Sequence, residues 1–372
     1  MQLQSDDELL EGIGRWVEIE SQTAHTDGVN RMMDDAERLF RETGAIVERI
    51  TGGQGYADCL SVSSPWGGDS PGVLVLSHLD TVHPEGTLQQ NPYRIDGDKV
   101  YGPGIYDMKG GAYLGFAAYQ SLVREGRETP LPIRFLYVSD EEIGSRFSRP
   151  LIEAAGARAK FALVTEPARQ GGKVVTGRKG TARYQINAHG RPSHSGSLHA
   201  EGRSAIREMA RLVLAIEDRT DYARDITFNV GEIKGGSTAN TVPEFCWANI
   251  DLRVATMADF EEMDAFIRGL SSTDPDVKLT IAGQLNRPPY KKTPGIQALF
   301  DHARKLANEI GFDMEDTATG GGSDGSFIAA RVPTLDGLGV DGAGAHTLHE
   351  HLDKTSLQPR LALMRRLMET LE

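Results

Sequence analysis

The sequence predicts an α/β fold with a mixed, mainly parallel sheet, into which a smaller unit of the order βαββαβ is inserted. Three apolar runs, at residues 72–77, 133–138 and 161–165, have the β-branched and aromatic composition of strands buried on both faces. Helical patterns stand between these runs, which is typical of parallel strands joined by helices. From about residue 178 the pattern becomes an alternation of apolar and polar residues, which favours an antiparallel sheet with one exposed face.

The elements around these strands follow in order along the chain. Apolar residues at helical spacing after Ser5 predict a first amphipathic helix, and Gly44 ends a second one. This second helix is expected over 30–43, and the other elements before the inserted unit are strands over 45–50 and 59–62 and helices over 112–124 and 148–155. After it we expect a helix over 294–308, a short helix following the glycine-rich segment 319–324, a strand over 333–338 and a last helix to Leu371. Residues 1–177 and 288–372 are predicted to form one domain.

The inserted unit is predicted to span residues 178–287 as a compact domain of its own. Its expected elements are a strand over 182–188, a helix over 204–217, strands over 226–232 and 245–254, a helix over 258–270 and a strand over 277–282. This order predicts an antiparallel sheet with both helices on one face. Since the strands are half exposed, an edge strand is able to pair with a second copy of the chain, and we expect a homodimer through this domain.

Composition excludes two classes of partner. The chain has 372 residues and a formal charge of −13, whereas nucleic-acid binding needs a concentrated basic surface. No run approaches the roughly 18 apolar residues of a membrane span, so we expect no membrane partner. The N-terminal MQLQSDDELL is acidic where a secretory signal is basic, and Cys59 and Cys246 stand apart in apolar contexts. We therefore expect free thiols and a cytoplasmic protein.

Acidic residues and histidines gather where the predicted strands end. The segment 133–145, IRFLYVSDEEIGS, ends its strand with three consecutive acids, Asp140, Glu141 and Glu142. Carboxylates crowded at the end of a buried strand are costly unless a cation or a shared proton offsets their repulsion. Taken alone, the stretch could equally be a solvated acidic turn ended by Gly144. The other such residues at strand ends or in glycine-rich loops are His78, Asp80, Asp107, Glu166 and His346.

These residue types favour one kind of chemistry. Asp107, in the loop GPGIYDMKGG before a helix, could by itself be a helix cap. As a set, however, imidazoles and carboxylates without cysteine suit zinc, cobalt or manganese in a centre that also holds water. The sequence therefore predicts a metal site that also holds water, rather than a structural one.

Five ordered motifs, SHLDTV, GPGIYDMKGG, SDEEIGS, TEP and GAHTLHE, resemble those of the M20 family of metallopeptidases and deacylases. The resemblance covers nearly the whole chain. It is greatest to the glutamate carboxypeptidase branch, with succinyl-diaminopimelate desuccinylase and acetylornithine deacetylase as relatives. It implies a zinc-peptidase-like catalytic domain, and it identifies the inserted βαββαβ unit as a ferredoxin-like dimerisation (lid) domain.

The resemblance also implies the metal ligands. Two zinc ions per subunit, with cobalt or manganese as possible substitutes, would be bridged by Asp107. His78 and Glu166 would complete one metal position, and Glu142 and His346 the other.

Two further acids receive roles from the same resemblance. Glu141 would be the general base that takes a proton from water and passes it to the leaving amine. Asp80 would orient the His78 ring by accepting its second N–H. Asp140 has no role beyond a possible turn cap.

The tail offers three histidines as the last ligand. The family pattern HxxxE selects His346 with Glu350. A different register would make His349 the ligand instead. Otherwise we expect His349 and His351 to be exposed loop residues.

The inserted domain resembles the family at its substrate-binding segments. His194, in RPSHSG, matches a histidine expected to cross the dimer interface and to donate to the carbonyl oxygen as negative charge develops there. Asn240 and Arg253 match segments that hold the substrate carboxylate, a role that suits the planar fork of arginine. Arg287 and Lys179 lie near basic contacts of the glutamate-specific branch, although both could equally be surface cations. Gly321 would bring a backbone amide to the substrate.

We therefore predict a metal-dependent amidohydrolase or carboxypeptidase. It would cleave the amide bond of a small N-acyl or C-terminal amino acid, glutamate-like, with a metal-activated water and Glu141 as the base. One alternative is an N-acyl amino acid deacylase of the acetylornithine deacetylase or succinyl-diaminopimelate desuccinylase type. Another is a non-catalytic amino-acid-binding protein on the same fold, which would have no need of the base Glu141.

Overall fold

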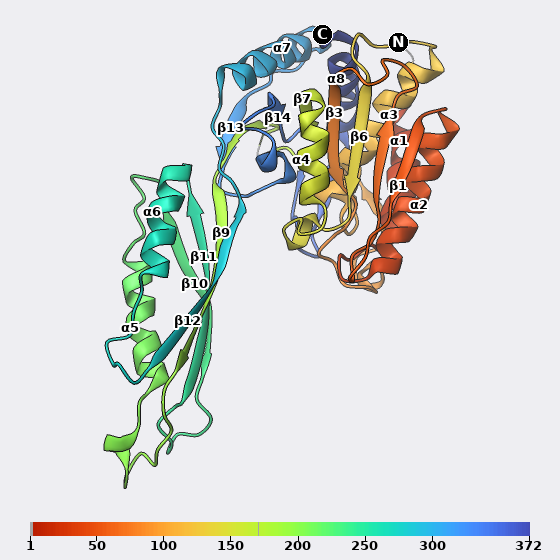
Figure 1. The fold of residues 1–372 in the computed structure, drawn as a ribbon. Coiled ribbons are helices and arrows are strands. Elements are labelled where there is room, and N and C mark those ends of the chain that lie inside the picture. The colour runs from red at the N-terminus through yellow and green to blue at the C-terminus, as the bar shows by residue number, and fades with distance from the viewer. Residues whose placement is uncertain (1–2, 170) are drawn as a thin grey trace. The chain divides into compact units, whose positions relative to one another are not determined.

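The computed structural model describes residues 3–169 and 171–372, which form two compact units (Figure 1). The described residues of Met1–Gly177, together with Lys292–Ala318 and Ser323–Glu372, make up the first unit. The second unit comprises Arg178–Lys291 and Thr319–Gly322. Within the described residues, no helix is both long and apolar enough to cross a bilayer.

A six-stranded sheet organises the first unit, in the order β1-β2-β6-β3-β7-β14. Strand β3 is parallel to both β6 and β7, and β14 is parallel to β7, whereas β1 and β2 are antiparallel additions at one edge. The predicted mixed, mainly parallel sheet is confirmed. The strands are β1 (Ile46–Ile50), β2 (Cys59–Ser63), β3 (Gly72–His78), β6 (Ile133–Val138), β7 (Ala159–Val164) and β14 (Thr334–Leu335).

Helices cover both faces of this sheet, and every residue of β3 and β6 is buried as predicted. Val73 and Val75 of β3 belong to the large core that also contains residues of α1, α2, α3, α7 and α8. Leu74 and Leu76 face the opposite way and pack with Ile152 of α4. The helices are α1 (Asp6–Glu18), α2 (Thr26–Glu42), α3 (Gly110–Arg124), α4 (Arg149–Ala157), α7 (Pro294–Ile310) and α8 (Leu357–Thr370).

Capping residues explain where several helices begin. Ser5 and Glu8 form a reciprocal capping box at the start of α1, and Thr293 caps α7 just before Pro294. The predicted start of α2 at residue 30 is wrong, because the helix begins at Thr26 after His25, whose side chain makes no capping hydrogen bond. A start without a capping side chain leaves no mark in the sequence.

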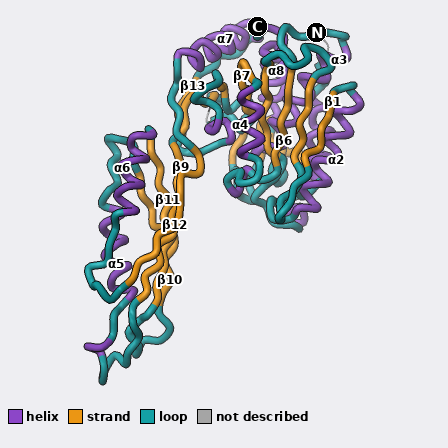
Figure 2. The backbone as a smooth tube through the Cα atoms, viewed as in Figure 1, coloured by secondary structure: helices purple, strands orange, loops and turns teal. Residues whose placement is uncertain are grey.

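The second unit is a four-stranded antiparallel sheet in the order β10-β11-β9-β12. Alternate residues of β9 such as Tyr184 and Ile186 are buried in a core shared with α5 and α6, which lie on one face of the sheet (Figures 1 and 2). The predicted βαββαβ order is confirmed. The elements are β9 (Gly180–His189), α5 (Ala205–Glu217), β10 (Thr227–Gly235), β11 (Phe245–Val254), α6 (Met257–Arg268) and β12 (Lys278–Arg287).

Two small sheets were not predicted. One pairs β8 (Val174–Arg178) with β13 (Asp316–Thr319), and the other has the order β15-β16-β5-β4. The strands of the second sheet have two or three residues each and carry no periodic signal, whereas β8 and β13 pair although they lie far apart in the chain. Strand β14 is also shorter than the strand expected over 333–338. The strands of the second sheet are β4 (Arg94–Asp96), β5 (Lys99–Tyr101), β15 (Gly342–Ala343) and β16 (His351–Asp353).

Candidate metal centre

The carboxyl ends of β3, β6 and β7 meet at one edge of the six-stranded sheet, because these strands are parallel neighbours. His78 is the last residue of β3, and Glu166 follows β7 by two residues. Glu141 and Glu142 lie in the short 3-10 turn Glu141–Ile143 after β6. Asp107 comes from the turn Ile105–Lys109 before α3. The predicted strand-end residues thus reach one place from separate segments of the chain.

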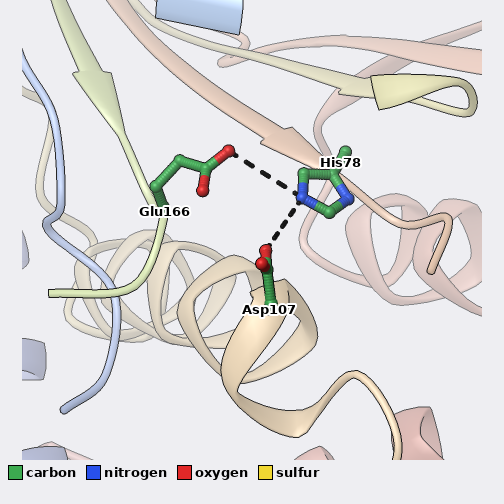
Figure 3. Close-up of side chains that lie close together, drawn as sticks. All are labelled: His78, Asp107 and Glu166. Atoms are coloured by element: carbon green, nitrogen blue, oxygen red, sulfur yellow. Dashed lines mark hydrogen bonds and ion pairs between the residues drawn. The ribbon is translucent and has the colours of Figure 1, made fainter. Parts of the chain in front are cut away.

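His78 stands opposite two carboxylates (Figure 3). Its Nε2 atom lies 3.3 Å from Oδ1 of Asp107 and 3.8 Å from Oε1 of Glu166. The ligand atoms of these three residues all lie within 4.8 Å of one another. One ring nitrogen and two carboxylate oxygens therefore face a common point.

A second group of the same kind is built on the other oxygen of Asp107. Nε2 of His346 lies 3.4 Å from Oδ2 of Asp107 and 3.3 Å from Oε2 of Glu142. These ligand atoms also lie within 4.8 Å of one another. Asp107 is the one residue common to both groups, and it presents a different oxygen to each.

The electrostatics show how strongly these groups interact. Burial and the nearby Asp107 carboxylate raise the pKa of Glu142. Burial also disfavours the Asp107 carboxylate, but hydrogen bonds with His346 and His78 outweigh burial and lower its pKa. Hydrogen bonds with Asp107 and Glu142 raise the pKa of His346 to about 10. Crowded carboxylates need positive charge beside them, which imidazolium groups provide here and a divalent cation would also supply.

The donor set fits a metal ion. Two imidazole nitrogens and three carboxylates, without a thiolate, are the ligands of hydrolytic zinc, cobalt or manganese centres. Oε1 of Glu142 is buried and has no hydrogen-bond partner among the described residues. An unpaired oxygen in a buried carboxylate is costly unless something else binds it. The residues therefore fit a metal centre better than a set of internal ion pairs.

Asp80 holds the turn that carries the two glutamates. Its carboxylate accepts the N–H groups of Glu141 and Glu142 at 3.2 Å each, and the hydroxyl of Thr23 at 2.7 Å. Nδ1 of His78 lies 2.9 Å from the backbone carbonyl oxygen of Asp80 and 3.5 Å from its Oδ1. The ring therefore donates first to the carbonyl, while the carboxylate fixes the Glu141–Glu142 turn. Sequence reasoning missed Thr23, since a lone threonine before a helix gives no signal.

Asp140 closes the loop that follows. Its buried carboxylate accepts the N–H of Phe147 at 2.7 Å and that of Ser148 at 3.3 Å. The residue thus fixes the far side of the turn and does not belong to either group of metal-binding type.

Of the three histidines in the tail, the structure brings only His346 into these groups. His349 is exposed. The ring of His351 lies beside Tyr101, with a centroid distance of 5.2 Å, and its Nδ1 is 2.9 Å from the carbonyl oxygen of His349. Both residues belong to the loop and the small sheet around β16.

In the second unit, His194 and Asn240 lie on adjoining exposed loops. The N–H of Ser195 donates to the carbonyl oxygen of Asn240 at 3.0 Å. Nδ1 of His194 accepts the N–H groups of Gly196 and Ser197 at 3.1 and 3.2 Å, which places the proton of a neutral ring on Nε2. The imidazole is thereby set as an N–H donor at its outer nitrogen.

Arg253 and Arg287 surround the glycine-rich loop at Gly321. The guanidinium of Arg253 donates to Asp251 through two bonds of 2.5 and 3.0 Å, a pairing that the sequence did not reveal. Arg253 also donates to the carbonyl of Gly320, and Arg178 donates to that of Gly321, at 3.3 and 3.1 Å.

Two further contacts complete this loop and its surroundings. Arg287 is buried so close to Gly322 that a Cβ added there would lie 2.4 Å from its Cδ. A larger residue at position 322 would therefore displace the Arg287 side chain. Lys179, by contrast, forms an ion pair with Asp225 at 3.0 Å.

The loops of His194 and Asn240 and the contacts around Arg253 lie at opposite ends of the four-stranded sheet. Arg253 pairs with Thr181 at the start of β9, and Phe245 pairs with His189 at its end. Eight residues at about 3.4 Å each separate the two pairs by roughly 27 Å. A single small substrate cannot contact Arg253 and the His194 loop of the same chain, because both belong to one compact unit.

The fold and the paired clusters are those of a metal-dependent hydrolase, and comparison with known proteins agrees. The profile of peptidase family M20/M25/M40 matches residues 74–370. The chain belongs to this family, and it is accordingly a hydrolase that acts on amide bonds.

Individual relatives span almost the entire chain. It is 30% identical to carboxypeptidase G2 of a Pseudomonas species, over 97% of this chain and 88% of that protein. It is 27% identical to succinyl-diaminopimelate desuccinylase of Paracidovorax citrulli, over 88% of this chain and 89% of that protein. Among solved structures, a tripeptidase from Staphylococcus aureus has a TM-score of 0.80 at 19% identity, covering 99% of each chain. An M20 family metallo-carboxypeptidase from Sulfolobus solfataricus has a TM-score of 0.78 at 15% identity, covering 98% of this chain and 99% of that one.

Proposed function

We propose that this hydrolase uses two zinc ions per subunit, or cobalt or manganese, to release a glutamate-like amino acid from an N-acyl or peptide amide. The division of the Asp107 carboxylate between two ligand groups carries this proposal. His78 and Glu166 would hold one ion, and Glu142 and His346 the other.

The residues of the chain then divide the work of hydrolysis. The bound ions would lower the pKa of water and polarise the amide carbonyl. Glu141 would take the proton from the attacking water and return it to the leaving amine. The contacts of Asp80 support this assignment. Its carboxylate accepts the N–H groups of both Glu141 and Glu142, and it would so hold Glu142 toward the metal and Glu141 toward the substrate. The Nε2–H of His194 would donate to the carbonyl oxygen as charge develops there.

We propose a homodimer in which His194 and Asn240 act on the substrate bound by the partner subunit. The roughly 27 Å between the His194 loop and Arg253 within one sheet supports this arrangement. The exposed strand β10 is an edge of that sheet and offers free backbone groups for pairing. The cytoplasmic location stays a prediction from the sequence.

Substrate choice would rest on the second unit. Arg253 has the fork that binds a carboxylate at two oxygens, and Arg287 and Gly321 lie at the same end of the sheet. The similarity to carboxypeptidase G2 favours glutamate as the released amino acid. The similarity to succinyl-diaminopimelate desuccinylases keeps a deacylase of that type as the second candidate.

A reconstitution experiment tests both the metal and the substrate. The chelated protein is loaded with zinc, cobalt or manganese, and its metal content is measured. It is then assayed on N-acyl glutamates, folate-like compounds, acetylornithine and succinyl-diaminopimelate. We expect two ions per subunit, activity only after loading, and release of glutamate. Activity indifferent to chelation would refute the metal mechanism, and turnover of succinyl-diaminopimelate alone would establish the deacylase.

A further inference from the structure

Glu350 is a fully buried carboxylate directly behind the candidate metal centre. Its Oε1 accepts the backbone N–H groups of Tyr106 and Asp107 at 2.9 Å each. Its Oε2 accepts the N–H of Gly104 at 2.9 Å and Nε2–H of His83 at 2.5 Å. Each carboxylate oxygen therefore has two donors, and a side chain that offers fewer acceptor sites would leave buried N–H groups unpaired.

The positions of these donors connect three ligand-bearing segments. His83 lies five residues after His78, in the segment that leaves β3. Asp107 contributes its own N–H. Glu350 itself lies four residues after His346, on the same loop. One carboxylate thus joins the backbone around the residues of both ligand groups.

The loop around Asp107 cannot supply these acceptors itself. Gly104 has a left-handed φ of +70°, and the residues after it form an irregular turn in which Asp107 is not helical. Such a turn points several N–H groups in one direction and favours an anion at their focus. Glu350 occupies that focus, so the direction of the Asp107 backbone depends on it.

We propose that Glu350, together with His83, is a positioning residue that sets Asp107 between the two metal positions. The inference rests on the proposed metal centre, and it assigns a role to the glutamate of the HxxxE motif. Neither residue would touch metal or substrate. They would act through the backbone of Asp107 and through the loop that carries His346.

The substitution Glu350→Gln tests this role with little change of volume. The amide keeps one acceptor oxygen but turns an –NH₂ toward N–H donors, so the loop must shift. We expect the affinity of the chelated protein for Co²⁺ and Zn²⁺, measured by competition with a chelator, to fall by about 10–100-fold. The visible absorption of the cobalt-loaded protein should also change, because the ligand geometry changes. Glu153→Gln, on the exposed face of α4, is the matched control and should bind as the wild type does.

Two variants of His83 provide a rescue. His83→Gln keeps an N–H that can reach Glu350, whereas His83→Phe removes the donor at similar volume. We expect His83→Gln to stay within about threefold of wild-type metal affinity and His83→Phe to lose about tenfold. If Glu350→Gln does not fold, the two His83 variants still test the positioning role, because they differ in a single hydrogen-bond donor to Glu350.

The outcomes separate the two proposals. Failure of the wild-type protein to bind metal would end the proposed metal centre itself. If the wild type binds two ions, unchanged cobalt affinity and spectrum in Glu350→Gln, or equal affinities of the two His83 variants, would overturn the positioning role. A lower thermal midpoint alone would show that Glu350 is only structural.

Discussion

The candidate site residues of the two units differ in how far they are buried. Those at the carboxyl ends of the six-stranded sheet are mostly buried, and those on the loops at one end of the four-stranded sheet are exposed. At the first, His78, Asp80 and Glu166 are buried and Asp107 is mostly covered, although His346 is exposed. At the second, His194 and Asn240 are exposed on loops. Parallel strands covered on both faces bring their carboxyl ends together, whereas an antiparallel sheet with one open face distributes its loops between two ends.

The difference shows what each kind of sheet requires of the polar residues placed at its ends. A carboxylate can be buried only when N–H donors or cations satisfy it, and in the first unit the N–H groups of Glu141 and Glu142 satisfy the buried carboxylate of Asp80. In the second unit, Nδ1 of His194 accepts two backbone N–H groups of its own loop, so Nε2 is the nitrogen that carries the proton of the neutral ring. The two ligand groups of the first region come from one chain, whereas we propose that the second region acts on a substrate bound by another subunit.

The largest expected effect tests the division of roles within the first region. Glu141→Gln removes the base but keeps a side chain of the same size on the turn fixed by Asp80. We expect kcat to fall by about 10²–10⁴-fold with metal content unchanged. Steady-state kinetics and metal analysis of the same preparation check this. Loss of metal together with rate would mean that Glu141 is a ligand, and undiminished turnover would refute its role as base.

A smaller effect is expected from the second region. Arg253→Lys replaces a two-pronged contact by a point charge, and a hydrogen bond to a charged group is worth about 1.5–3 kcal/mol. We expect kcat/KM for substrates with a free carboxylate to fall by about 10–100-fold, while the corresponding amides are little affected. Kinetics on an acid and amide pair measure this selectivity. An equal loss for both substrates would remove Arg253 from carboxylate recognition.

The pH dependence of metal binding tests whether His346 must release a proton before it can bind metal. Because the pKa of His346 is raised to about 10 in the metal-free protein, its imidazole is protonated at neutral pH and must release that proton to bind metal. We expect metal affinity to rise by about tenfold per pH unit between pH 6 and 8 for each proton released. Calorimetry in buffers of different ionisation enthalpy counts the protons, and a count of zero would contradict the assignment.

The same shift affects stability with the opposite sign. A raised folded-state pKa means that protonated His346 stabilises the metal-free fold fully below its unfolded value of 6.5, and that this contribution is lost as the pH rises toward 10. Metal should reverse this trend. Thermal unfolding of metal-free and loaded protein across this range compares the two directly.

An experiment with mixed subunits tests whether His194 acts on the site of the same chain or on that of its partner. Co-expressed His194→Ala and Glu141→Ala chains form hybrid dimers in which one of the two sites is intact, so the purified hybrids should have about half of wild-type activity. Each variant alone should be nearly inactive. Recovery, measured on dimers purified through two different tags, places His194 across the interface, and its absence would put the site within one subunit.

The smallest effect is expected at Asp251, the internal partner of Arg253. Asp251→Asn keeps an acceptor for the guanidinium but removes the competing negative charge. Because a partly exposed ion pair is worth less than about 1 kcal/mol, KM for carboxylate substrates should fall by only about threefold. A KM that rises instead would show that Asp251 chiefly orients Arg253.

Most of the fold could be predicted because its elements carry local signals. Buried runs such as Ile133–Val138 and the alternation of Phe245–Val254 fixed the strands at nearly their observed limits. The parallel order of the strands then made it possible to expect His78, Glu142 and Glu166 at one edge. What could not be predicted are the strands of two or three residues, which are too short for a periodic signal, and the pairing of β8 with β13, which lie far apart in the chain.

The sequence by itself determined the chemical type of the site: imidazoles and carboxylates at strand ends, with Glu141 beside them. Only the tertiary structure decided how these groups are used. In the structure, each carboxylate oxygen of Asp107 lies beside a different histidine. The guanidinium of Arg253 donates to Asp251, and Glu350 accepts the backbone N–H of Asp107. The physical reason is that every buried N–H and carboxylate must find a partner, and the partner nearest in space has no fixed distance along the chain.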